Sequence, residues 1–161
     1  MIPVSFEEVK NRVDLALNNF RERDLQLLEL CADERAATHR IACYLQKYFA
    51  DWHVDCEYNR KGRQSKKIND ELVRPDIIVH RRNTFENLLC IEAKKAGGST
   101  SDINEDRKKL RGFTEESGEY SYKFGLLMIF SLEIPYVIKG EWYQDGKKRE
   151  SVVFPVSQDV K

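Results

Sequence analysis

Two short apolar segments that carry acidic residues decide the expected fold of this chain. Residues 74–80 read RPDIIVH, and residues 88–94 read LLCIEAK. Each has the length and composition of a β-strand. The connection between them, residues 81–87, reads RRNTFEN and is polar enough to lie on the surface. We therefore predict that the two segments form an antiparallel hairpin.

The register of this hairpin brings acidic side chains together. If His80 pairs with Leu88, Asp76 lies opposite Glu92. Two like charges would then face each other with Cβ atoms about 4.5–5.5 Å apart, which destabilises a sheet unless something compensates. Because side chains alternate along a strand, Glu92 and Lys94 project from the same face as Asp76. The hairpin is predicted to end in a cluster of two acids and one lysine, although surface salt bridges at strand ends are the plainer alternative.

A third acid joins this cluster from a predicted helix over residues 33–50. Apolar side chains recur there at steps of three and four residues and form one buried stripe. Glu34 lies about 20° from the stripe residues Ile41 and Leu45 on a helical wheel of 100° per residue. Charged residues are seldom buried unless they are paired or bind a metal. The alternative is an acid in the first helical turn, stabilised by the helix dipole.

The rest of the chain supplies the other elements of an α/β domain. A capping box at residues 5–8 predicts a first helix that ends near residue 30. Alternation predicts a strand over residues 54–58, and a glycine-rich break predicts a helix that begins near residue 101. Residues 124–130 are nearly all apolar, which is typical of a central strand. Asp145-Gly146 predicts a hairpin turn between residues 136–143 and 152–156. The predicted order is α, α, β, β, β, α, β and a β hairpin.

Length, composition and charge limit the classes of partner. The 161 residues suit a single domain over residues 1–161, with 41% hydrophobic and 34% charged residues. No segment has the length and apolar character of a membrane span or the form of a signal peptide, so we expect a cytoplasmic protein. The 27 basic residues are balanced by 27 acidic ones, so a polyanion is not attracted by net charge.

Binding of nucleic acid would therefore need a local basic patch. The candidate is a run over residues 60–67 that contains no acid. Its basic residues are Arg60, Lys61, Arg63, Lys66 and Lys67. The alternative interpretation of this run is a solvated loop.

The motifs in residues 74–79 and 91–94, RPDIIV and IEAK, resemble the signature of the PD-(D/E)XK nuclease superfamily, also called the restriction-endonuclease-like fold. The family core is described as αβββαβ, with the aspartate on the second strand and the E-x-K motif on the third. The predicted element order is the same. The resemblance spans about residues 33–130 and leaves an extra N-terminal helix and a C-terminal β hairpin outside it. It implies an α/β fold with a mixed sheet flanked by helices.

The resemblance also implies roles for individual residues. Asp76 and Glu92 would hold Mg²⁺ or Mn²⁺, with the backbone carbonyl of Ala93 as a further ligand. Glu34 would help to hold a second ion or a water bound to the metal. Lys94 would position the attacking water or stabilise the transition state. Residues 106–110 also resemble a helical segment that follows the E-x-K strand in some members, with no role assigned to it.

No histidine is expected in this site. His39 lies about 140° from Glu34 on the helical wheel, and His53 flanks a strand. His80 shares a face with Asp76 but sits about 13 Å farther along the strand.

The resemblance implies a metal-dependent nuclease, with DNA as the expected substrate. Two other classes stay open. One is a binding module that keeps the fold and no longer cleaves, because fold alone does not establish activity. The other is a subunit of a larger nucleic-acid-processing assembly, as a homodimer or with a partner protein that supplies targeting.

Overall fold

The computed structural model describes residues 3–29, 34–56, 74–131, 133 and 136–154, and the backbone of residues 60–61, 64–65, 67–68 and 71–72. These last residues form two small antiparallel pairs. Strand β2 (Arg60–Lys61) pairs with β3 (Gln64–Ser65), and β4 (Lys67–Ile68) pairs with β5 (Glu71–Leu72).

The basic segment predicted to contact nucleic acid falls in this region. The backbone of Arg60, Lys61 and Lys67 belongs to the small strands, whereas Arg63 and Lys66 lie outside the described residues. The side chains of all five lie outside the described part of the chain, so their contact with nucleic acid stays a prediction.

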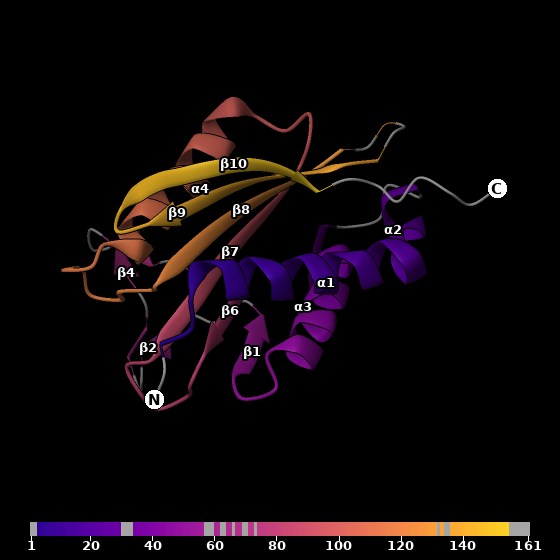
Figure 1. Ribbon diagram of the computed structural model, residues 1–161. Helices are drawn as coiled ribbons and strands as arrows, with labels where there is room; N and C mark the ends of the chain where they lie inside the picture. The colour runs from indigo at the N-terminus through magenta and orange to yellow at the C-terminus, as the bar shows by residue number, and fades with distance from the viewer. Residues whose placement is uncertain are drawn as a thin grey trace.

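One mixed sheet of six strands forms the centre of the fold, in the order β1-β6-β7-β8-β9-β10 (Figure 1). The strands are β1 (His53–Cys56), β6 (Ile77–His80), β7 (Asn87–Lys95), β8 (Phe124–Phe130), β9 (Ile138–Gln144) and β10 (Lys147–Phe154). Neighbours run antiparallel except for β7 and β8, which are parallel. A parallel pair needs a long crossover connection, and α4 (Thr100–Thr114) provides it.

Helices cover both faces of the sheet (Figure 1). On one face lie α1 (Phe6–Asp24), α2 (Gln26–Glu29) and α3 (Glu34–Tyr48), and on the other lies α4. Strand β7 serves both cores, because its side chains alternate: Ile91 and Ala93 pack in the larger core with α1 and α3, whereas Cys90 packs in the smaller core with α4. None of the described helices is long and apolar enough to cross a lipid bilayer.

The main helices and strands follow the predicted order, but the four short strands β2 to β5 were not predicted, and several boundaries differ: the last strand begins at Lys147 and not at residue 152. The hydroxyl of Ser5 accepts a hydrogen bond from the Glu8 amide at 3.2 Å, which caps α1 as expected. The single helix predicted up to residue 30 is instead two, because α1 ends at Asp24 and α2 begins at Gln26. The strand predicted to begin at residue 74 begins at Ile77. Proline has no amide hydrogen to donate to a ladder, so Pro75 is a poor strand residue.

The hairpin of β6 and β7 keeps the predicted register in its centre, where Ile78 pairs with Cys90. The pairing of His80 with Leu88 is wrong: a register shift after Val79 pairs His80 with Asn87. The turn explains the shift. The Arg81 amide donates to the Glu86 carbonyl at 2.9 Å, and this pair is offset by one residue from the pairing in the centre of the hairpin.

The C-terminal hairpin forms as predicted from its Asp-Gly sequence. Gln144 and Lys147 pair directly across a two-residue turn. Asp145 has a φ of 50° and Gly146 a φ of 71°, so both adopt the left-handed conformation that this class of hairpin turn requires.

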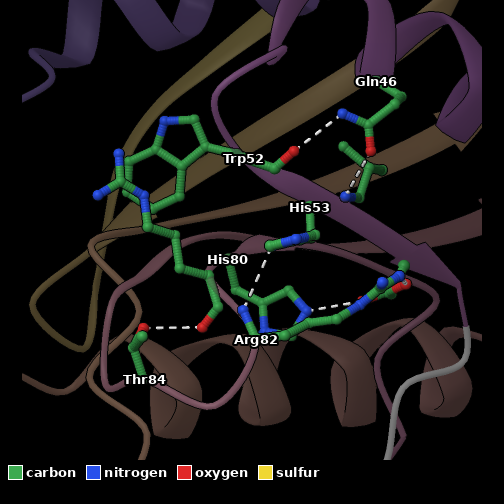
Figure 2. Close-up of polar contacts among 9 residues, drawn as sticks. Gln46, Trp52, His53, His80, Arg82 and Thr84 are labelled. Atoms are coloured by element: carbon green, nitrogen blue, oxygen red, sulfur yellow. Dashed lines mark hydrogen bonds and ion pairs between the residues drawn. The ribbon is translucent and has the colours of Figure 1, made fainter.

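Polar contacts attach the edge strand β1 to β6 (Figure 2). The Asp55 carboxylate accepts hydrogen bonds from His80 Nε2 at 2.7 Å and from Arg82 Nε at 2.9 Å. The Arg82 amide donates to Nδ1 of His53 at 3.3 Å. These contacts join β1 to the segment that follows β6 and fix the edge of the sheet.

The charge of Asp55 is expected to contribute to stability. The hydrogen bond from Arg82, with that from His80, lowers the pKa of Asp55 to about 2, although burial opposes this. A lowered carboxyl pKa adds stability above the unfolded-state value of about 3.9, and that stability is lost as the pH falls through about 2. Asp55→Asn should therefore lower the free energy of unfolding by about 1–2 kcal/mol at pH 7. The difference in the free energy of unfolding between Asp55→Asn and the wild type should decrease between pH 4 and pH 2.

Urea denaturation at pH 7, 4 and 2.5 measures this difference. Exposed Asp51 on the preceding turn provides the matched control, and Asp51→Asn should leave stability nearly unchanged. A deficit for Asp55→Asn that stays constant down to pH 2.5 would contradict the assigned role of its charge.

Candidate functional site

Two carboxylates from different segments are held by the backbone of β7 near its C-terminal end. Asp76 lies just before β6, and its Oδ2 accepts a hydrogen bond from the Ala93 amide at 2.8 Å. Glu34 is the first residue of α3, and its Oε2 accepts from the Lys95 amide at 3.1 Å. The pairing of β6 with β7 begins only at Ile77, so the Ala93 amide donates to the Asp76 carboxylate and not to a strand carbonyl.

Two further acids lie in the layer between β7 and α4. Glu92 is 3% exposed and Asp106 of α4 is 1% exposed. Asp106 forms ion pairs with Lys109, at 3.1 Å from Nζ to Oδ1, and with Lys94, at 3.5 Å from Nζ to Oδ2. Both Glu92 Oε1 and Asp106 Oδ2 are buried, but Asp106 Oδ2 has the ion pair with Lys94, whereas Glu92 Oε1 accepts no hydrogen bond from the described residues. Buried carboxylate oxygens in this state are costly for the folded protein.

The pKa values respond to this crowding. Burial raises the pKa of Glu92 well above its ordinary value, and the charges of Asp76 and Asp106 raise it further. Burial also raises the pKa of Asp76 and of Glu34, although the amides of Ala93 and Lys95 oppose the shift.

Lys94 responds in the opposite sense. Burial opposes its charge, but the carboxylates of Asp106 and Glu34 outweigh burial and raise the pKa of Lys94. The site therefore combines carboxylates that favour a proton or a cation with an ammonium group that stays charged.

The donor set suits a hard divalent cation. Carboxylate and carbonyl oxygens are the ligands of Mg²⁺, which is commonly held by one or two carboxylates together with waters and substrate phosphates. Among the described residues, no three His, Cys, Asp or Glu side chains form a group that could hold a metal by themselves. Asp76 and Glu92 would supply two ligands, and a substrate or waters must complete the shell.

The Ala93 carbonyl is placed to join them. The amide and carbonyl of a strand residue point to the same side of the strand. Because the Ala93 amide points to Asp76, its carbonyl also faces the side on which β6 has ended.

The structure brings all of the predicted acidic and amine side chains to one end of β7. Glu34, Asp76, Glu92 and Lys94 influence one another electrostatically or share its backbone donors. His53 and His80 lie elsewhere, in the contacts between β1 and β6 (Figure 2).

Sequence reasoning missed the part played by Asp106. Residues 106–110 were noted only for their resemblance, yet Asp106, Leu110 and Phe113 follow steps of four and three residues and are all buried. The same helical stripe that drew attention to Glu34 would have found Asp106.

His39 lines a pocket together with Glu34 and Asp76, although it lies about 140° from Glu34 on the helical wheel. The pocket runs along α3 for more than one turn, so residues on neighbouring sides of the helix reach it.

A scan against protein-family models finds no match to this chain, and a search of curated proteins finds no significant match. The geometry and chemistry of the site therefore carry the functional argument.

The buried charge of Glu92 is expected to destabilise the protein when no metal is added. Since its pKa is raised in the folded state, the stability that its protonated form provides is present below about pH 4.3 and lost as the pH rises through the folded-state pKa. In EDTA at pH 8, Glu92→Gln should raise the free energy of unfolding by about 1–2 kcal/mol, because glutamine keeps the shape and needs neither a buried charge nor the uptake of a proton on folding. The gain should be absent at pH 4.

Glu141 of β9 provides the matched control. It is also buried, but its oxygens accept hydrogen bonds from Arg107 at 2.7 and 3.0 Å and from the Tyr143 hydroxyl at 2.9 Å. Glu141→Gln should lower stability by about 1–3 kcal/mol. Chemical denaturation measures both variants, and a loss of stability in Glu92→Gln at pH 8 would contradict a net cost of burying the Glu92 carboxyl group.

Proposed function

We propose that this chain is a metal-dependent nuclease that hydrolyses phosphodiester bonds, with DNA as its substrate. The observation that carries the proposal is a buried carboxylate, Glu92, that lacks a hydrogen-bond donor at Oε1 and lies beside Asp76 and Asp106, with Lys94 two residues farther along the same strand. Proteins seldom keep such an arrangement without a function, because perturbed groups of this kind cluster at catalytic sites.

The architecture supports the fold-family part of the proposal. The elements α3, β1, β6, β7, α4 and β8 follow the order of the restriction-endonuclease-like core, with short strands β2–β5 between β1 and β6. Strands β7 and β8 are parallel and joined through α4. The acids lie at the ends of β6 and β7, which is where this fold family would hold its metal.

Asp76, Glu92 and the Ala93 carbonyl would hold Mg²⁺ or Mn²⁺, with Glu34 beside them to hold a second ion or an associated water. The bound ion would supply positive charge to the phosphate and lower the pKa of a water. Asp76 and Glu34 would be oriented before the ion binds, because they accept hydrogen bonds from the amides of Ala93 and Lys95.

Lys94 would stabilise the negative charge that develops on the phosphate oxygens. Its ammonium is 3.5 Å from Asp106 Oδ2, and its side chain is 33% exposed. The ion pair with Asp106 holds the ammonium in place, and its exposed part remains accessible to a substrate. Lys109 shares the same carboxylate and neutralises part of its charge. A charge fixed before the reaction stabilises a transition state without reorganisation.

The delivery of the substrate is a further part of the proposal. The acids repel a polyanion, so the basic residues 60–67 would bind the phosphate backbone and make affinity depend on salt. We also propose that the chain acts as a homodimer or with a partner protein that supplies targeting. The proposed location is the cytoplasm.

Nuclease activity is the direct test. At least one of plasmid and single-stranded DNA should be cut in Mg²⁺ or Mn²⁺, and both should be left intact in EDTA. Asp76→Asn and Lys94→Met should each lower the rate about 100-fold or more. Lys108→Met changes an exposed lysine of the same helix as Asp106 and should retain the wild-type rate. Activity that survives Asp76→Asn would refute the assigned roles.

Binding of the metal can be measured separately. Mn²⁺ at about 100 times its dissociation constant should stabilise the wild type by about 2.7 kcal/mol, because it binds the folded state only. Asp76→Asn should lose most of this gain, as measured by thermal unfolding and calorimetry. A protein that binds nucleic acid but shows no affinity for Mn²⁺ would instead be the binding module.

A further inference from the structure

A pocket of about 450 Å³ adjoins the acidic site, between the first turns of α3 and the segment that leads into β6. It is lined by Glu34, Arg35, Thr38, His39, Cys56, Arg74 and Asp76. Pockets for small ligands span about 300–1,000 Å³. A space at the lower end of this range accommodates one nucleotide, whereas a base-paired duplex is far too wide to enter it.

The lining of the pocket divides into an acidic part and a basic part. Glu34 and Asp76 are partly buried and are held by amides of β7. Arg35, His39 and Arg74 are exposed, so they form the rim. A phosphate is repelled by the carboxylates and attracted by the guanidinium groups, which place planar forks of N–H donors against phosphate oxygens. An anion therefore belongs at the rim and a cation at the inner end.

We propose that this pocket binds one phosphate-bearing nucleotide of the substrate strand, with Arg35 and Arg74 on its phosphate. The phosphodiester bond to be cut then lies at the inner end of the pocket, beside Glu34 and Asp76. The inference rests on the proposed nuclease function and narrows its substrate to a strand with an unpaired nucleotide, either at an end or in a single-stranded region.

Binding of a mononucleotide in EDTA tests the pocket without metal or cleavage. Thymidine 5′-monophosphate should bind and shift the amide resonances of Thr38 and His39 in a labelled protein, whereas thymidine should bind far more weakly. Replacing both arginines, in R35A/R74A, should weaken binding of the monophosphate about tenfold or more. The control R23A/R111A removes the same charge from exposed positions of α1 and α4 and should bind as the wild type does.

Several results would overturn the inference. These are no binding of the monophosphate, equal binding of thymidine, or an equal loss of affinity in R23A/R111A. Cleavage of closed circular duplex DNA as fast as single-stranded DNA would overturn the claim that the substrate needs an unpaired nucleotide.

The two proposals can fail independently. A protein that binds the monophosphate through both arginines but never cleaves DNA refutes the nuclease and keeps the pocket. A protein that cleaves without this binding refutes the pocket alone.

Discussion

The site depends on one constraint, which is the burial of a carboxylate on a central strand. Strand β7 is covered by helices on both faces, and its alternation directs Ile91 and Ala93 into one core and Glu92 into the other. Glu92 cannot turn to solvent without moving the strand that carries those apolar side chains. The charges of Asp76 and Asp106 also disfavour its ionised form, whereas Lys109 favours it, so a bound proton or a further cation would stabilise this carboxyl group.

The protein compensates for the surrounding charges unevenly. Asp76 and Glu34 receive amide hydrogens from β7, and Asp106 receives Lys94 and Lys109. Glu141, on the same face of the sheet, has Arg107 and Tyr143 on its two oxygens. The two buried acids of one sheet therefore differ: both oxygens of Glu141 accept hydrogen bonds, whereas Oε1 of Glu92 accepts none from the described residues.

Much of the fold could be predicted from local patterns. The apolar run at β8, the stripe of α3 that includes Glu34 and the Asp-Gly turn of the last hairpin all follow from the periodicity of side chains and from turn chemistry. Errors arose at the ends of elements, which periodicity does not fix. The Arg81 to Glu86 bond accompanies the register shift at His80, and β6 begins only at Ile77, so Asp76 lies outside the ladder.

The sequence by itself determined which residue types gather near the end of β7, because alternation and helical periodicity assign each side chain to a face. Only the tertiary structure decided which of these charges are satisfied. The position of Asp106 depends on how α4 crosses the sheet, and the pocket lined by Arg35 and Arg74 depends on how α3 meets the segment before β6. Such distances between elements are set by the packing of two cores, which no local pattern specifies.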